Sequence, residues 1–341
     1  MLVASDRHPV GRGLGLMRSG RRHRLVFAVG LLSAVLALVW ALVAGDMPIS
    51  LGEVFAALGG GEGMTAAIIR ELRLPRAVAA FVSGGLLATA GALMQVLLRN
   101  PLADPYILGI SGGAAVGALL GMTLGVAALA VDALAFGGAL TAMLLVFGLA
   151  HGDGSWTQTR LLLTGVIVAA GCGAAVSLML ALAPDTRVMS MLFWMMGDAS
   201  AAARPWPAAL VLVVAVAAVQ PFARDLNVLA RGELSARALG VQVQRLRMAL
   251  YVLASLLTAT AVTLVGSVGF VGLIIPHLVR LVLGNDQRVL IPAAALAGGT
   301  LLTLADTAAR TVIAPQQLPV GVLTALIGVP VFLFLLARHP R

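Results

Sequence analysis

The segment Leu74–Leu97, LPRAVAAFVSGGLLATAGALMQVL, carries a long apolar stretch in which Arg76 is the only charged residue. An α-helix needs roughly 20 predominantly apolar residues to cross the hydrocarbon core of a bilayer. The segment meets that length, and its many small residues are of the kind that membrane helices use where they pack closely. The segment therefore predicts a membrane-spanning helix.

The rest of the chain has the same character. Of 341 residues, 60% are hydrophobic and 11% are charged, whereas soluble domains have about 45–50% apolar and about 25% charged residues. A soluble protein could not bury so much apolar surface. All 23 basic residues are arginines that lie between apolar segments and not on one soluble domain, which argues against nucleic-acid binding. The one cysteine, Cys172, cannot form an internal disulfide and is interpreted as a core residue.

Hydropathy predicts ten membrane spans and an all-α, polytopic fold. The predicted spans are Leu25–Ala44, Leu74–Leu97, Ile107–Gly121, Val126–Ala150, Leu161–Ala183, Pro207–Phe222, Met248–Val265, Val268–Leu283, Val289–Val312 and Leu318–Ala337. Several of them are short, as is typical of helices that line a cavity in a transporter. The runs Ile107–Gly117 and Val289–Gly299 are weakly alike and suggest an internal duplication.

The arginines predict the orientation, because cytoplasmic loops are enriched in basic residues. Residues 1–24 contain six arginines and are expected to form a cytoplasmic leader without ordered structure. Residues 25–337 are expected to form one transmembrane domain, and residues 338–341 a cytoplasmic tail. Both termini are therefore placed in the cytoplasm of a multi-pass protein of the bacterial inner membrane.

Two short segments are expected outside the bilayer core. Ile49–Gly61 is predicted to form an amphipathic helix on the outer surface, and Met189–Gly197 is apolar but too short to cross. Four outer arginines run against the orientation rule and need a reason. They are Arg70, Arg73, Arg76 and Arg310.

The longest charged inner segment is Arg224–Arg247. Within it, Glu233–Gly240 predicts a short amphipathic helix that ends at a glycine able to adopt a left-handed cap. Such a helix can lie with its apolar face in a groove of a partner protein. A solvated loop that follows the positive-inside rule is the alternative, and the residues alone leave both open.

Six stretches carry a resemblance to a known family. They are Leu72–Arg76, LRLPR; Gly91–Gly109, GALMQVLLRNPLADPYILG; Leu226–Gly240, LNVLARGELSARALG; Gly269–Arg280, GFVGLIIPHLVR; Ala305–Arg310, ADTAAR; and Leu318–Pro330, LPVGVLTALIGVP. In order and spacing they resemble the iron-chelate and vitamin B12 uptake permeases of bacterial ABC importers. The resemblance covers nearly the whole chain from the first span onward.

The resemblance implies a type II ABC importer permease with ten helices in two inverted or duplicated halves. It implies a homodimer around a central pathway for a ferric siderophore, haem or cobalamin. Two ATPase subunits would bind ATP and Mg on the cytoplasmic side, and a periplasmic or lipid-anchored binding protein would dock outside. The permease itself would be no enzyme and would hold no cofactor or metal.

The resemblance also assigns roles to residues. Arg73, Arg76 and Arg310 match outer arginines that receive acidic residues of the binding protein, a task suited to guanidinium groups; anchoring to lipid headgroups is the alternative. Leu226–Gly240 matches the loop that couples the permease to its ATPase. The coupling residues expected there are Leu229, Arg231, Gly232, Glu233, Ser235, Arg237, Leu239 and Gly240.

Polar residues inside the membrane usually face a cavity or the bundle interior. Gln95 is a candidate either for the pathway or for a hydrogen bond between helices. His277 is expected to be structural, because no second ligand stands at metal-binding spacing, and Asp306 is expected to neutralise Arg310, four residues later. Two inner loops, Asn100–Pro105 and Ser155–Arg160, are expected to narrow the exit. Their predicted gate residues are Asn100, Pro101, Leu102, Gln158 and Thr159.

Two other classes of function fit the sequence less well. An ion-driven secondary transporter would carry paired carboxylates or an ion site near the midplane, and the sequence has only scattered ones. An intramembrane enzyme would need a catalytic constellation such as His-Glu-x-x-His, which does not occur. The chain also has no lysine and so no P-loop, which means that ATP hydrolysis must come from a separate subunit.

Overall fold

A computed structural model describes residues 11–45, 47–150, 157–200, 202 and 204–338 of the chain. The elements in this part are helices, and no strand occurs among them. Seven helices are long and apolar enough to cross a membrane, and three shorter apolar helices accompany them, so the described residues supply the ten predicted spans.

The ten span helices lie where the sequence predicts them. Most of their ends differ from the predicted bounds by only a few residues. They are α1 (Gly11–Val43), α4 (Leu74–Leu97), α5 (Ile110–Leu124), α6 (Ala128–Ala150), α7 (Gln158–Leu182), α9 (Trp206–Val219), α12 (Val243–Val265), α13 (Val271–Leu283), α14 (Gln287–Thr311) and α15 (Val320–Arg338). The other helices are α2 (Leu51–Leu58), α3 (Met64–Ala67), α8 (Asp185–Met196), α10 (Ala223–Arg231) and α11 (Glu233–Ala238). Single turns complete the order: the π-helical η1 (Ile68–Arg73), η2 (Pro105–Leu108) and η3 (Gln220–Phe222).

Helix α1 begins inside the segment that was expected to lack ordered structure. It starts at Gly11 and continues without a break to Val43, whereas residues 1–10 lie outside the described part. No proline occurs after Pro9 in the leader, and arginine is a good helix former. A helix that has started in the apolar span can therefore extend backward, because adding a residue is easier than starting a new helix.

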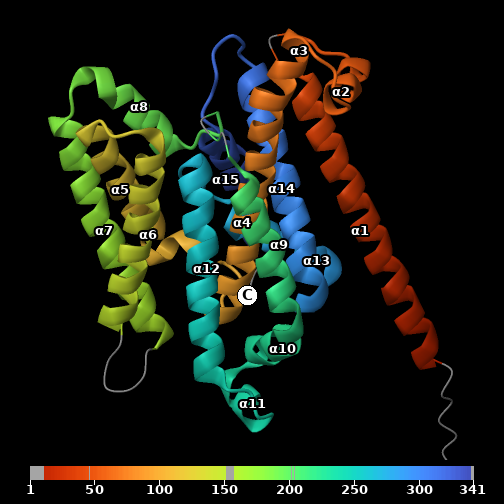
Figure 1. Cartoon of the computed structure of the whole chain (residues 1–341). Coiled ribbons are helices and arrows are strands. Elements are labelled where there is room, and N and C mark those ends of the chain that lie inside the picture. Colours follow the sequence, from red (N-terminus) through yellow and green to blue (C-terminus); the bar gives the residue numbers. More distant parts are fainter. Residues whose placement is uncertain (1–10, 46, 151–156, 201, 203, 339–341) are drawn as a thin grey trace, which may run out of the picture.

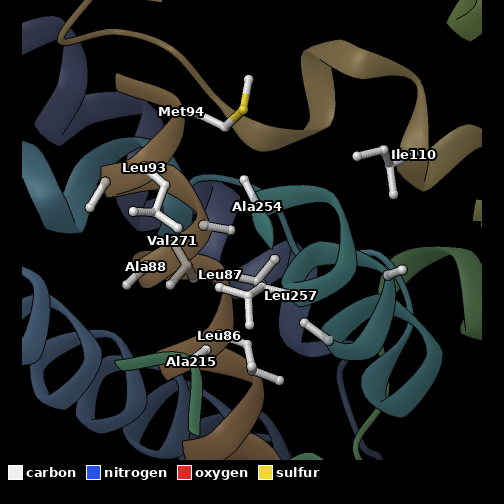
Figure 2. Close-up of a cluster of buried hydrophobic side chains, with 14 of the residues drawn as sticks. Leu86, Leu87, Ala88, Leu93, Met94, Ile110, Ala215, Ala254, Leu257 and Val271 are labelled. Carbon is white, nitrogen blue, oxygen red and sulfur yellow. The ribbon is translucent and has the colours of Figure 1, made fainter. Parts of the chain in front are cut away.

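Helix α4 forms the centre of the fold. It packs against α14, α12, α13 and α9, and most of its residues are buried. Figure 1 shows it enclosed by these helices, with α1 leaning against α14 at the periphery. In Figure 2, Leu86, Leu87 and Leu93 of α4 lie among side chains from α12 and α13. The stretch Leu74–Leu97 is thus the core helix of the protein.

Glycines allow the helices around α4 to approach very closely. A Cβ atom on Gly84 would collide with the carbonyl group of Gly298 in α14. One on Gly91 would collide with the backbone of Gly272 in α13. Membrane helices gain packing energy in this way, because lipid gives them little hydrophobic drive to associate.

A second group of helices stands beside this core. Helix α5 packs against α6 and α7, and α12 joins the group to the centre through contacts with α6 and α5. Figure 1 shows the group as a separate layer of the bundle. Only 11% of the most apolar stretch of α7 is buried, so this helix presents an apolar surface to its surroundings.

The helices outside the spans mark the two ends of the bundle. Figure 1 places α10 and α11 at one end, called here the α11 end, together with the start of α1. It places α2, α3 and α8 at the other, the α2 end. The predicted outer helix at Ile49–Gly61 is found as α2, which begins with a capping box. There, hydrogen bonds from Ser50 hold the pKa of the Glu53 carboxyl below its usual value.

Candidate coupling, gating and docking sites

Arg73 secures the end of α1. This buried residue stands at the end of η1, and its guanidinium donates three hydrogen bonds to backbone oxygens near the C-terminus of α1. The acceptors are the carbonyl oxygens of Leu42, Val43 and Met47, at 2.8, 2.9 and 2.5 Å. Carbonyl groups in the last turn of a helix have no partner within the helix and carry partial negative charge. Arg73 supplies both the donors and the positive charge.

Arg310 and Arg70 also donate hydrogen bonds to backbone carbonyl oxygens near the ends of helices. Arg310, in α14, donates to the carbonyl oxygen of Ala44 at 2.7 Å and also to that of Ala41. Arg70 donates to the carbonyl oxygens of Ala57 and Gly61, at 2.6 and 2.7 Å, at the end of α2. These contacts give Arg73, Arg310 and Arg70, which were predicted to lie on the outer side, partners within the chain.

Arg76 forms a buried ion pair with Asp306. Its Nε lies 2.9 Å from Oδ2 of Asp306 and its Nη2 lies 3.0 Å from Oδ1, so the contact joins α4 to α14 in a two-pronged way. Nη1 also donates to Oε1 of Gln317 at 2.9 Å, and Asp198 lies 4.0 Å away. Asp306 was expected to neutralise Arg310, and its close ion pair is with Arg76 instead. The carboxylate turns across the helix interface to α4, and Arg310 reaches toward α1.

The three predicted docking arginines line a single cavity at the α2 end. The cavity holds about 440 Å³, and Glu71 and Gln317 contribute to its wall. The structure therefore brings these arginines together, although each of them also makes contacts within the chain. Their role in docking a binding protein stays a prediction.

Asp306→Asn tests the structural part of this network. We expect it to destabilise the fold by about 3 kcal/mol, because it leaves the charge of Arg76 buried without its partner. Thermal unfolding of the purified protein measures the change, and Asp185→Asn, at an exposed acid at the start of α8, is the control. Equal unfolding temperatures for the two variants would contradict the buried pair.

At the α11 end, the predicted amphipathic helix is present. Helix α11 runs from Glu233 to Ala238 and lies between two glycines with positive φ, Gly232 at +141° and Gly240 at +79°. The Glu233 carboxylate lies 2.6 Å from Nη2 of Arg237 and 3.4 Å from Nη1 of Arg247, at the start of α12. The helix is thus attached to the bundle through Glu233.

The apolar residues of this loop are left uncovered. Leu234 is 84% exposed and Leu239 is 70% exposed, whereas Leu229 and Ala236 are buried against the bundle. Arg231 and Ser235 lie on the surface beside them. Exposed leucines are more stable against an apolar partner surface than in water, so this charged loop is a candidate contact site for a partner protein.

The two predicted gate segments touch each other at the same end. Arg99 donates from Nη2 to Oε1 of Gln158 at 3.2 Å, and Gln158 donates from Nε2 to the carbonyl oxygen of Leu97 at 3.1 Å. The Asn100 side chain accepts from the amide of Leu102 at 2.9 Å and shapes the turn that also contains Pro101. These hydrogen bonds hold the first turn of α7 against the end of α4.

One correction applies to the second gate segment. Ser155–Arg160 was expected to be a loop, but α7 already begins at Gln158. The hydroxyl of Thr157 accepts a hydrogen bond from the amide of Arg160 and caps the helix. Gln158 and Thr159 therefore belong to its first turn, and Ser155 and Trp156 lie outside the described residues.

Gate and coupling residues share a cavity of about 350 Å³. Its wall combines Gln158 and Thr159 of α7 with Glu233 and Arg237 of α11, and Arg247 lies between them. Residues of α11 and of the first turn of α7 thus face the same cavity. This arrangement could not be predicted from the sequence, because these residues lie far apart along the chain.

The remaining intramembrane polar residues have structural surroundings. Gln95 is 3% exposed and donates from Nε2 to the carbonyl oxygen of Leu273 at 3.1 Å, which is the bond between helices that was one of its two alternatives. His277 follows Pro276 inside α13 and is partly buried.

Sequence reasoning missed a junction of loops near the middle of the bundle. The hydroxyl of Tyr106 accepts from the amide of Val268 at 3.0 Å, and the hydroxyls of Ser111 and Ser267 lie 2.9 Å apart. Beside them, Met195 and Gly321 line an apolar cavity of about 570 Å³ on the face of α8 and α15. The glycine-rich run Gly266–Gly269 was the available signal, since glycine in a transporter span often marks a break.

The bundle has ten span helices, loops meet near its middle, and an exposed charged loop lies at one end. These features are those of a multi-pass membrane transport protein. The comparisons identify its family. The FecCD transport family matches residues 32–338, and the chain belongs to this family.

Named relatives and a solved structure agree. The chain is 45% identical to the cobalamin import system permease protein BtuC of Halobacterium salinarum, over 79% of this chain and 73% of that one. It is 42% identical to the hemin transport system permease protein HmuU of Yersinia pestis, over 79% of this chain and 83% of that one. It also matches a putative metal-chelate type ABC transporter solved in an inward-facing conformation. That match has a TM-score of 0.81 and 29% identity, and it covers 93% of this chain and all of the other.

Proposed function

We propose that the chain is the membrane-spanning subunit of an ATP-driven importer that carries a metal chelate into the cytoplasm. The observation that carries this proposal is α11, a short helix between two glycines that presents Leu234 and Leu239 to a partner. A carrier driven by an ion gradient has no use for such a helix. The buried acid of α14, Asp306, is already paired with Arg76 and so offers no free ion site.

The proposed cargo is a tetrapyrrole or siderophore complex of a metal. Relatives that share 42% and 45% of the aligned residues are named for haem and cobalamin, and both cargoes are bulky, partly apolar chelates. The apolar cavity beside Met195 has flexible, polarizable methionines in its lining, which could contact such a ligand without binding it tightly. Selection of the cargo then rests with the binding protein.

The proposed working unit contains two copies of the chain. The sparsely buried α7 and the apolar cavity on α8 and α15 lie on surfaces that the single chain leaves open. Two copies facing each other would enclose a pathway between these surfaces. Two ATPase subunits would attach at the α11 end, and a binding protein would dock at the α2 end near the arginine cavity.

The proposed power stroke passes from α11 to α7. When the ATPase subunits close on ATP, they would move α11, whose Glu233 contacts Arg247 of α12. The cavity that α11 shares with Gln158 and Thr159 would carry that movement to the exit. The gate and the coupling helix would then act as one unit.

Co-purification tests the assembly. The tagged chain is expressed with the ATPase and the binding protein encoded beside its gene, and the mass of the complex is measured by light scattering. We expect two permeases with two ATPases. A chain that purifies alone under every condition, with intact partners present, would refute the proposal.

Cysteine crosslinking tests the gate. Cysteines at Asn100 or Gln158, in a background without Cys172, are expected to form crosslinks between the two copies, in amounts that change when ATP is added. A cysteine at Gly148, an open position on α6, is the control and is expected to give none. If no nucleotide state gives crosslinks at Asn100 or Gln158, these residues do not line the exit.

A further inference from the structure

A second polar cavity opens at the α11 end, separate from the one shared by gate and coupling helix. It holds about 580 Å³ and lies where the ends of α4 and α13 meet α10 and the start of α14. Three arginines contribute to its wall: Arg99 of the turn after α4, Arg231 of α10 and Arg280 of α13. Pro101 and Arg231, predicted for the gate and for the coupling loop, belong to its wall, but neither prediction assigns a ligand to it.

The charge of the cavity is mainly positive. Asp286 is the one acidic residue among the described residues of its wall. The Asp286 carboxylate is already engaged, since Oδ1 accepts from Nδ2 of Asn227 at 2.8 Å and from the amide of Arg288 at 3.1 Å. It caps α14 and does not reach an arginine within ion-pair distance.

Two of the arginines have no partner in the described part of the chain. The guanidinium groups of Arg231 and Arg280 form neither a hydrogen bond nor an ion pair there. Arg280 is partly buried, so its charge is also partly removed from water. Such a cation is stabilised when an anion joins it, and guanidinium groups bind phosphate oxygens through paired hydrogen bonds.

Two buried glutamines in the wall of the cavity have hydrogen-bond acceptors without a donor in the described part of the chain. Gln95 is 3% exposed and Gln287 is 1% exposed, and the side-chain oxygens of both lack a hydrogen-bond partner among the described residues. Buried polar atoms are nearly always paired in native proteins, and an unpaired one destabilises the fold. These two oxygens would gain a partner if a donor, such as a hydroxyl group, entered the cavity and reached them.

We propose that this cavity binds a phosphate group attached to a hydroxyl-bearing fragment, of which a glycerol phosphate is the simplest example. The phosphate would contact Arg99, Arg231 and Arg280, and the hydroxyls would donate to Gln95 and Gln287. The headgroup of phosphatidylglycerol and a free glycerol phosphate share this chemistry. Because Arg231 belongs to the coupling loop, the ligand would brace α10 against α4 and α13.

Two simpler explanations account for less. The positive-inside rule explains why arginines gather at this end, but not why three of them share a cavity wall with two buried glutamine amides. A carboxylate from a partner protein would satisfy the arginines, but it has no hydroxyl to offer the glutamine oxygens. A hydroxylated phosphate meets both needs at once.

The test uses the purified full-length chain in nanodiscs of phosphatidylcholine. Binding of sn-glycerol 3-phosphate and of sulfate, which has charge but no hydroxyl, is measured by calorimetry. A parallel arm replaces one fifth of the lipid with phosphatidylglycerol and counts retained lipids by native mass spectrometry. We expect glycerol phosphate to bind at least about tenfold more tightly than sulfate, because its hydroxyl groups supply hydrogen bonds that sulfate lacks.

Variants separate the site from general surface charge. Arg231→Gln changes an exposed side chain that forms no hydrogen bond or ion pair in the described part of the chain, so we expect it to keep the fold and to weaken binding about tenfold or more. Arg280→Gln is expected to act in the same way, and Gln287→Met is expected to reduce the preference for glycerol phosphate over sulfate. Arg288→Gln, beside the cavity but not in its wall, is the matched control and is expected to change little.

Each outcome decides the matter. Binding of the soluble compound identifies a free phosphate ligand, and retention of phosphatidylglycerol alone identifies a lipid; both support the site. Equal effects of Arg231→Gln and Arg288→Gln would reduce it to surface charge and overturn it. If neither compound binds while Arg280→Gln weakens assembly with the ATPase, the occupant is an acidic side chain and the proposal is wrong.

Discussion

Replacing both Leu234 and Leu239 with aspartate is expected to abolish assembly with the ATPase while leaving the permease folded. Both side chains are largely exposed in the isolated chain, so the change removes little internal packing. In the proposed complex each leucine would be buried, which contributes about 1.5–3 kcal/mol per side chain. The loss of both corresponds to an affinity at least about a hundredfold weaker. Pull-down of the ATPase and the thermal stability of the permease are the two measurements.

Leu58→Asp is the matched control for this pair. Leu58 is 50% exposed and ends α2 at the opposite end of the bundle, so aspartate there should leave ATPase binding unchanged. Full ATPase binding by the double variant, with transport intact, would show that α11 is only a solvated loop.

Gly91→Leu is expected to prevent the protein from folding stably. A side chain at this position would enter the backbone of Gly272, and backbone atoms cannot rotate away as a side chain can. Overpacking of a well-packed core commonly destabilises a protein by about 1–3 kcal/mol, and a collision with backbone lies at or above that range. Fluorescence-detected size exclusion of the solubilised protein measures the surviving folded fraction.

Gly137→Leu provides the comparison. Gly137 lies in α6, also a span helix, and a side chain there meets no atom within 4 Å. We expect this variant to run as a folded protein at wild-type yield. Equal losses for both variants would indicate that any leucine added to a span is harmful, and the close contact between α4 and α13 would then carry no special weight.

The spans could be predicted from the sequence because the signal is local. A run of apolar residues long enough to cross a bilayer identifies a helix without reference to its neighbours. Leu74–Leu97 was predicted with the bounds that α4 has in the structure. The helix at Glu233 was equally local, since its charged residues, its apolar residues and its terminating Gly240 all lie within one turn or two of each other.

The partners of the charged residues could not be predicted in the same way. Asp306 and Arg310 stand four residues apart on one helix, a spacing that favours a pair on an isolated helix. In the fold, Asp306 faces α4 and pairs with Arg76, and Arg310 reaches the end of α1. Which face of a helix meets which neighbour is decided by packing, and one sequence does not contain that information.

The same limit applies to the outer arginines as a group. Their contacts with carbonyl groups at the ends of α1 and α2 are visible only once those ends are located. Resemblance suggested docking, and the structure adds a role inside the chain for each of them. An arginine can make internal contacts and also receive an acidic residue of a binding protein, because its guanidinium group has five N–H donors.

Chelate-dependent ATP hydrolysis in proteoliposomes tests the central claim most directly. The permease, its ATPase and its binding protein are reconstituted together, and hydrolysis is followed with cobalamin, haem or a ferric siderophore present, alongside uptake of the labelled chelate. The account predicts that one chelate-loaded binding protein raises hydrolysis several-fold and that the label enters only with ATP. Uptake driven by an ion gradient without ATP or the ATPase would contradict it.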